Sequence, residues 1–238
     1  MTEIKICGIT RLEDALCAAR SGADALGFIF YPPSRRCVSP EQARRIRAEL
    51  PEEIVAVGVF VNQDASFVED VAGSCGLDMI QLHGDEPPEY CLRFSRERLI
   101  KVVWPGESMD IGALGTYPVK AFLADGGDSE RRGGTGRTTD WDLSAVLGSA
   151  FPLVLAGGLR EDNIREALAA VRPRAVDINS GIETAPGIKD HERMRRIITA
   201  VREDGEPGEE GGPAIFRPLL PGADRGSVNV PGMRKDKP

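Results

Sequence analysis

The sequence predicts an α/β protein, and a closed TIM-type (β/α)8 barrel is favoured over an open doubly wound sheet. Three observations support this. Short apolar runs alternate with longer amphipathic stretches, the alternation occurs eight times, and it occupies about 200 of the 238 residues. Such alternation gives a parallel sheet with crossover helices. The number of repeats and the total length then favour the barrel.

Eight apolar runs rich in Val, Ile, Leu and Phe are the expected strands. Buried parallel strands form continuous hydrophobic segments bounded by Gly, Pro or charged residues. The runs lie at residues 4–7, 25–30, 54–61, 79–82, 99–104, 119–125, 152–156 and 175–178. In a barrel, the carboxyl ends of these strands meet at one mouth, where binding and catalytic groups gather.

The amphipathic stretches between these runs are the expected helices. They cover residues 11–21, 40–50, 65–76, 87–96, 141–147, 161–170 and 190–202, with a short Gly-broken helix at 108–115. Thr10 is the expected N-cap of the first helix and Gly22 its stop. Ser39 is the expected N-cap of the second, with Pro40 at the first helical position.

The last 36 residues differ from the rest in composition, because seven are Gly and six are Pro. This fraction is typical of disordered segments. We therefore expect a barrel domain over residues 1–202 and a disordered tail over 203–238, outside the folded unit. Two apolar pairs in the tail, Ile215 with Phe216 and Leu219 with Leu220, are at most a weak docking patch.

Composition excludes several classes of protein. No apolar run approaches the roughly 18 residues of a membrane-spanning helix, and the net charge of −7 argues against a nucleic-acid binder. The N-terminus lacks the pattern of a signal peptide. Five scattered cysteines and two histidines fit neither a disulfide framework nor a zinc site. We expect reduced thiols, a cytoplasmic location and no metal.

Small residues follow the last two strands, at Gly157 and Gly158 and at Ser180 and Gly181. Glycines let a ligand approach the backbone, and a helix that starts directly after such a turn offers free N–H groups. Barrels commonly bind a substrate phosphate here, although the glycines could simply form tight turns. The Gly-rich stretch at residues 133–136 is not a nucleotide phosphate loop and is expected to be a mobile active-site loop.

Cys7 and Asp125 end the first and sixth expected strands. Strand alternation places Cys7 on the same face as Lys5, toward the barrel axis. A thiol there can act as a base if nearby positive charge lowers its pKa; the alternative is a small buried hydrophobic residue. Asp125 could act as an acid or could cap the following loop. Together they would supply the base and acid of a proton-moving isomerisation.

Four more side chains are candidates for the same mouth. Arg35 or Arg36 could bind a substrate carboxylate, although a solvated pair is the alternative. For His83, a structural hydrogen-bonding role is favoured over a catalytic one. Asp177 lies near the end of the last strand, where it could orient a substrate hydroxyl.

Several motifs resemble the phosphoribosylanthranilate isomerase family of tryptophan biosynthesis. The most specific are KICGIT at residues 5–10 and QLHGDE at 81–86, which occur with SRRCVSP at 34–40, LAGGL at 155–159 and DINSGIE at 177–183. The resemblance runs in order from about residue 3 to residue 202. The tail is not part of it.

The resemblance implies a cofactor-independent Amadori rearrangement of N-(5′-phosphoribosyl)anthranilate to the corresponding 1-deoxyribulose 5-phosphate. Asp125 matches the family's general acid, Cys7 its general base and Arg36 the residue that holds the anthranilate carboxylate. The phosphate cradle matches Gly157, Gly158, Ser180 and Gly181. A monomer or a homodimer is implied. A lyase or synthase acting on a related phosphosugar, and a non-catalytic phosphosugar-binding barrel, are the alternatives.

Overall fold

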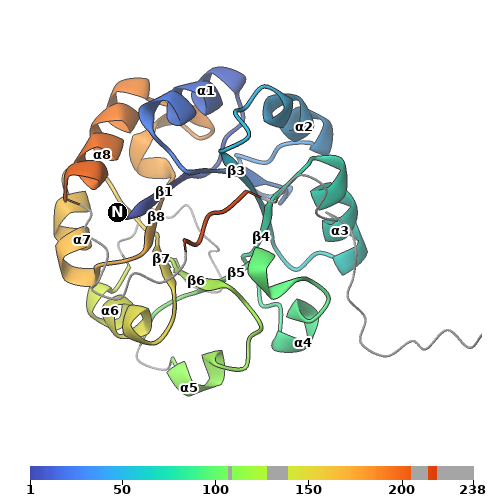
Figure 1. The fold of residues 1–238 in the computed structure, drawn as a ribbon, viewed down its shortest axis with the longest axis vertical. Helices are drawn as coiled ribbons and strands as arrows, with labels where there is room; N and C mark the ends of the chain where they lie inside the picture. The colour runs from blue at the N-terminus through green and yellow to red at the C-terminus, as the bar shows by residue number, and fades with distance from the viewer. Residues whose placement is uncertain (107–108, 128–138, 205–213, 219–238) are drawn as a thin grey trace, which may run out of the picture.

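The computed structural model describes residues 1–106, 109–127, 139–204 and 214–218. Its centre is a closed barrel of parallel strands in the order β1 to β8, with β1 paired to both β2 and β8 (Figure 1). The strands are β1 Glu3–Ile6, β2 Ala25–Ile29, β3 Val55–Phe60, β4 Met79–Leu82, β5 Leu99–Val103, β6 Ala121–Ala124, β7 Leu153–Leu155 and β8 Ala175–Ile178. The predicted (β/α)8 barrel is confirmed, and the open sheet is excluded.

Helices surround the barrel. They are α1 Leu12–Ser21, α2 Pro40–Ala48, α3 Ala65–Ser74, α4 Pro88–Cys91, α5 Ile111–Leu114, α6 Trp141–Ala150, α7 Ile164–Val171 and α8 His191–Asp204, with 3-10 turns η1 Arg96–Arg98 and η2 Ser180–Ile182. Within the described ranges, no helix has both the length and the apolar character needed to cross a membrane.

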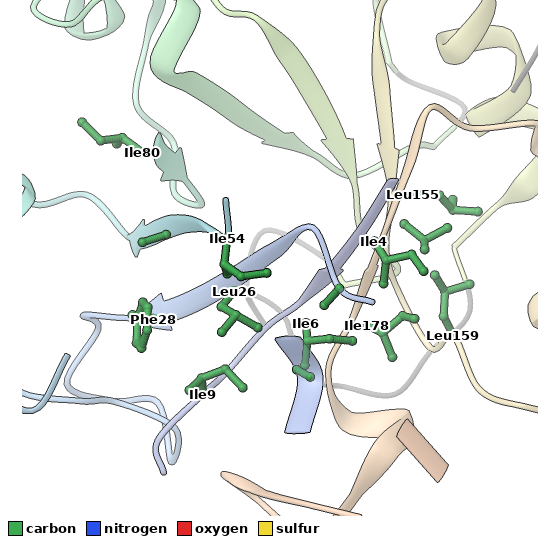
Figure 2. Close-up of a cluster of buried hydrophobic side chains, with 14 of the residues drawn as sticks. Ile4, Ile6, Ile9, Leu26, Phe28, Ile54, Ile80, Leu155, Leu159 and Ile178 are labelled. Carbon is green, nitrogen blue, oxygen red and sulfur yellow. The ribbon is translucent and has the colours of Figure 1, made fainter. Parts of the chain in front are cut away.

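Side chains alternate between the two faces of the barrel wall. Ile4 and Ile6 of β1 point outward into a buried apolar layer beneath the helices, together with Leu26, Phe28 and Ile178 (Figure 2). Lys5 lies between the two isoleucines and therefore points toward the barrel axis, with its side chain fully buried. The same alternation of inward and outward side chains directs Cys7, which follows Ile6, toward the mouth.

The helix caps agree with the sequence at two of three positions. Ser39 accepts a hydrogen bond from the backbone N–H of Gln42 at the start of α2, and Gly22 ends α1 with φ at 99°. The expected N-cap at Thr10 is wrong, because α1 is preceded by Arg11 and the Thr10 hydroxyl donates to the Gly187 carbonyl instead. A contact distant in sequence thus outcompetes the local cap.

A small antiparallel hairpin follows β8 and was not predicted. It consists of β9 Glu183–Ala185 and β10 Ile188–Lys189. Each strand is too short for a periodic pattern to be recognised. The hairpin brings Glu183 to Arg36, which follows β2, and Lys189 to Asn179, which follows β8.

The expected boundary at residue 202 needs correction in the described part of the tail. Helix α8 continues to Asp204, and Ile215 and Phe216 are buried rather than outside the folded unit. Their apolar side chains join the cluster inside the barrel, which outweighs the polar composition around them. The other residues of the expected tail, 205–213 and 219–238, lie outside the described residues.

Candidate active site

A cavity lies at the carboxyl ends of the strands, where barrels of this kind bind their ligands. Its wall contains most of the side chains singled out in the sequence. These are Cys7, Arg36, His83, Asp125, Gly157, Gly158, Asp177 and Ser180. Cys7 follows β1 and Asp125 follows β6, and both therefore face one shared space.

Cys7 follows β1 and is 4% exposed. Beneath it, the buried Lys5 ammonium donates to Asp177 Oδ2 at 2.9 Å. Gly27 of β2 leaves room for this arrangement, because a Cβ at that position would lie 2.8 Å from Cys7 Sγ and 3.0 Å from Lys5 Nζ. The thiol thus lies at the edge of a buried ion pair and faces the cavity.

Burial raises the pKa of the Cys7 thiol, and the Asp177 carboxylate raises it further. Lys5 and Lys189 act in the opposite direction, but the net pKa lies above the ordinary thiol value. The two lysines thus lower the pKa of this thiol, as the sequence suggested for nearby positive charge, but not enough to bring it below the ordinary value. The reason is that Asp177 pairs with Lys5 and opposes its effect, while the protein excludes water from the sulfur.

Asp125 lies just after β6, and its carboxylate accepts from the backbone N–H of Gly126 at 2.8 Å. Its Oδ2 lies 3.3 Å from His83 Nε2. Gln81 Nε2 lies 2.9 Å from His83 Nδ1, so an amide donor there requires Nδ1 to accept and places the ring proton on Nε2. Among the described residues, Nε2 itself makes no hydrogen bond and only approaches Asp125, so the hydrogen bond that the His83 ring makes is the one with Gln81.

Arg36 and not Arg35 lines the cavity, while Arg35 is exposed. Glu183 holds the Arg36 guanidinium through Nε, at 2.9 and 3.1 Å, and through Nη2, at 2.6 Å. None of these three bonds uses Nη1. The hydrogen bonds that Arg36 donates to Glu183 raise the pKa of Arg36 despite partial burial.

Lys189 supports Glu183 from the other strand of the hairpin. Its ammonium lies 3.0 Å from Glu183 Oε1 and 2.9 Å from Asn179 Oδ1. Although burial raises the pKa of Glu183, the hydrogen bond from Arg36 and the charge of Lys189 lower it more, so the net pKa lies below the ordinary value. Glu183 is therefore ionised at neutral pH and fixes the direction in which Arg36 points.

The small residues after β7 and β8 form one corner of the cavity. Gly157 and Gly158 have φ of 83° and 62°, a backbone region that favours glycine. The expected helix does not start directly after these two glycines, since α7 begins at Ile164. Instead, the Asn163 amide donates to the Gly158 carbonyl at 3.0 Å and holds the turn closed.

The sequence model of the family described as "N-(5'phosphoribosyl)anthranilate (PRA) isomerase" matches residues 4–200. The chain belongs to the phosphoribosylanthranilate isomerase family. The family members from Syntrophus aciditrophicus and Geobacter sulfurreducens are 52% and 50% identical to it, over 202 and 198 residues. These alignments cover 85% and 83% of this chain, and 88% and 97% of the two relatives.

Solved structures of phosphoribosylanthranilate isomerases agree with this assignment. The Thermotoga maritima enzyme is 45% identical with a TM-score of 0.78, covering 85% of this chain and 100% of that one. A complex with reduced 1-(o-carboxyphenylamino)-1-deoxyribulose 5-phosphate is 43% identical with a TM-score of 0.76, at the same two coverages. Monomers generated from the dimeric Thermotoga maritima enzyme are also 43% identical, with a TM-score of 0.74, and cover 85% and 99%.

As a phosphoribosylanthranilate isomerase, the chain is an enzyme of tryptophan biosynthesis. Two of its expected site residues do not line the cavity. Lys5 lies below Cys7 and is fully buried. Gly181 lies against the Leu159 backbone, so closely that a Cβ added to Gly181 would be 2.0 Å from the Leu159 carbonyl oxygen. Gly181 therefore lets two loops approach each other. The Gly-rich stretch at residues 133–136 lies outside the described residues.

Sequence reasoning did not single out four residues that shape the site of this phosphoribosylanthranilate isomerase. They are Gln81, Asn179, Glu183 and Lys189. Gln81 could have been found, because inward-facing strand positions alternate and Gln81 shares the phase of His83. Glu183 and Lys189 belong to the short hairpin, where no periodicity indicates orientation.

Proposed function

We propose that this family member isomerises N-(5′-phosphoribosyl)anthranilate to 1-(2-carboxyphenylamino)-1-deoxyribulose 5-phosphate by general acid–base catalysis, with Asp125 as the acid and Cys7 as the base. The observation that carries the proposal is that both side chains line one cavity, together with Arg36 and the small residues after β7 and β8. The aminoaldose and the aminoketose are isomers, so the reaction needs only proton transfers and no redox partner.

The proposed sequence begins when Asp125 protonates the ribose ring oxygen. The bond from C1′ to that oxygen breaks, and the anilino nitrogen donates its lone pair to form a protonated imine. The iminium makes the proton on C2′ acidic, and the Cys7 thiolate removes it. The electron pair of the C2′–H bond becomes the C1′–C2′ double bond of an enolamine, which gains a proton at C1′ and loses one from its hydroxyl to give the ketone.

Cys7 can remove the C2′ proton because the adjacent iminium has already made that proton acidic, so a strong base is not needed. A raised pKa leaves few thiolates at neutral pH, but each of them is a stronger base. The buried ammonium of Lys5, paired with Asp177 at 2.9 Å, supplies the counter-charge close to the sulfur. Cys7 therefore acts in a part of the site where positive and negative groups are held in fixed positions.

The remaining contacts would orient the substrate between the acid and the base. Nη1 of Arg36 would bind the anthranilate carboxylate, and the backbone around Gly157, Gly158, Ser180 and Gly181 would bind the phosphate, as the loops after strands seven and eight do in many barrels. No donor in the described part of the chain reaches Asp177 Oδ1. This buried oxygen is therefore available to accept a hydrogen bond from a sugar hydroxyl.

The first prediction concerns the thiol itself. Because burial holds the pKa of Cys7 above its ordinary value, the reactive thiolate should form only in alkaline solution. We expect the rate of Cys7 alkylation by iodoacetamide to have its midpoint above about pH 8.5, the ordinary thiol pKa. Peptide mass spectrometry at each pH would separate Cys7 from the other four cysteines. A midpoint below about pH 7.5 would show that Lys5 and Lys189 outweigh burial.

The second prediction compares two adjacent arginines. Arg36→Lys keeps the charge but loses the planar fork, so KM should rise about 10–100-fold while kcat changes much less. Arg35→Lys is the matched control, because Arg35 is exposed and absent from the cavity wall, and its KM should stay unchanged. Steady-state kinetics by anthranilate fluorescence would measure both. Equal effects in the two variants would contradict the assignment of the clamp to Arg36.

The proposed surroundings of the enzyme follow from the same chemistry. The substrate is a small phosphosugar, the reaction needs no cofactor, and a monomer or a homodimer would serve. Because all five cysteines are free thiols, we place the enzyme in the cytoplasm, where thiols stay reduced. Cell fractionation followed by the fluorescence assay would test the location.

A further inference from the structure

The end of the barrel opposite the mouth holds a piece of the chain that comes from beyond α8. Residues 214–218 lie within the ring of strands, drawn in red in Figure 1. Ile215 is 1% exposed and Phe216 is 5% exposed. Both belong to the apolar cluster that fills the barrel interior, although they follow the part of the chain that the family matches, residues 4–200.

The strands leave space for these two side chains at this end. The first residues of β2, β6 and β8 are Ala25, Ala121 and Ala175, and all three belong to the same cluster as Ile215 and Phe216. Barrel interiors are usually filled by bulky branched side chains. A methyl group takes up less of the interior than a branched side chain does, and Ile215 and Phe216 add an aliphatic and an aromatic side chain to the packing here.

A polar contact at this end fixes the segment in one position. The Glu3 carboxylate accepts the backbone N–H of Ile215 through Oε2, at 2.7 Å, and that of Phe216 through Oε1, at 2.9 Å. Two adjacent amides that would otherwise be buried without partners are satisfied by one side chain at the start of β1. The site thus combines an apolar hole with an acceptor pair for an extended backbone.

The connection from α8 is long enough for residues 214–218 to reach this site within the same molecule. In the last turns of α8, Arg202 donates to the Thr2 carbonyl at 2.9 Å, next to Glu3. The chain between Asp204 and Ala214 has nine residues, 205–213, and can span about 30 Å when extended. Both ends of this connection are therefore held near the first residues of β1, well within its reach.

We propose that the N-terminal end of this barrel is a docking site for a short extended peptide, and that its occupant is residues 214–218 of the same chain. The segment acts as a clamp that joins the end of α8 to the start of β1 and closes the barrel interior. It lies at the end of the barrel opposite the mouth, so it stabilises the fold and leaves the chemistry unchanged. The proposal does not depend on the roles assigned to Cys7 and Asp125.

The test uses the full chain and two variants of the contact, Phe216→Ala and Glu3→Gln. Phe216→Ala removes the largest side chain from the hole, and Glu3→Gln replaces one of the two acceptor oxygens with a donor. We expect Tm to fall by about 4–10 °C for Phe216→Ala, with a smaller fall for Glu3→Gln. In both variants, the amides of residues 215 and 216 should exchange with deuterium about tenfold faster or more. Turnover should stay within about twofold in both.

Leu92→Ala is the control, because it also truncates a large apolar side chain, but one that is 66% exposed and distant in sequence from the clamp. It should change neither Tm nor the exchange of the tail. Unprotected amides at 215 and 216 in the wild type, or an unchanged Tm in Phe216→Ala, would overturn the proposal. So would protection that disappears on hundredfold dilution, since the occupant would then come from a second copy of the chain.

Discussion

Replacing Cys7 with alanine is expected to reduce kcat about 10²–10⁴-fold, because the proposed base for the C2′ proton is then missing. The fold should remain, since the ion pair between Lys5 and Asp177 at 2.9 Å does not include the sulfur. The measurement is single-turnover fluorescence with N-(5′-phosphoribosyl)anthranilate, which separates the chemical steps from product release. Cys7→Ser should be similarly impaired, because a hydroxyl is much harder to ionise than a thiol.

Cys91→Ala is the matched control for the loss of a buried thiol. Cys91 lies at the end of α4, is fully buried and belongs to the layer between strands and helices, away from the cavity wall. Its replacement should lower Tm and leave kcat within about twofold. If Cys7→Ala retained wild-type turnover while remaining folded, the base would have to be another group.

Replacing Asp125 with asparagine should have a comparable effect, again about 10²–10⁴-fold on kcat. Asparagine has nearly the same shape, and its carbonyl can still accept from the Gly126 N–H, which the aspartate does at 2.8 Å. It cannot supply a proton to the ribose ring oxygen. The loss would therefore report the missing acid and not a displaced loop, and ring opening would become the slow step.

An exposed carboxylate provides the comparison for this variant. Asp142 lies in the first turn of α6 and outside the cavity wall, so Asp142→Asn should leave kcat unchanged. Circular dichroism and Tm for both variants would verify that the barrel is intact. Turnover of Asp125→Asn within threefold of the wild type would eliminate this carboxyl as the acid.

The two effects would also separate catalysis from binding alone. If the protein bound the phosphosugar and did nothing else, both variants would retain the wild-type Kd and there would be no turnover to lose. Equilibrium titration with the product, followed by the anthranilate fluorescence, would measure that affinity. An isomerase loses kcat in both variants, while its affinity for the product changes little.

Much of the barrel could be predicted from the sequence, because its signals are local. The runs at residues 79–82 and 175–178 match β4 and β8 residue for residue, since a buried parallel strand needs a continuous apolar segment with clear ends. The inward direction of Lys5 and the position of Cys7 at the mouth follow from strand alternation alone. The gathering of Cys7 and Asp125 at one cavity follows from the closed barrel, because all strands run in the same direction.

Only the tertiary structure showed which arginine lines the cavity and what holds it. The local pattern does not distinguish Arg35 from Arg36, although the family resemblance points to Arg36. The turn after β2 exposes Arg35 and presents Arg36 to Glu183, which is 147 residues away in the chain. The pKa shift of Cys7 likewise depends on several parts of the fold, because burial and Asp177 raise the pKa while Lys5 and Lys189 lower it. The distances between these groups are set only when the chain folds, so no local sequence pattern can predict the net pKa shift.

Residues 214–218 show most clearly the difference between what the sequence predicts and what the tertiary structure decides. Composition alone classifies residues 203–238 as chain without a core of its own, because Gly and Pro dominate and apolar residues are few. Ile215 and Phe216 are nevertheless buried, because they pack in the cluster inside the barrel and the Glu3 carboxylate accepts hydrogen bonds from their amides. Sequence by itself thus determined the elements and their phase, while the packing between elements determined which side chains became neighbours.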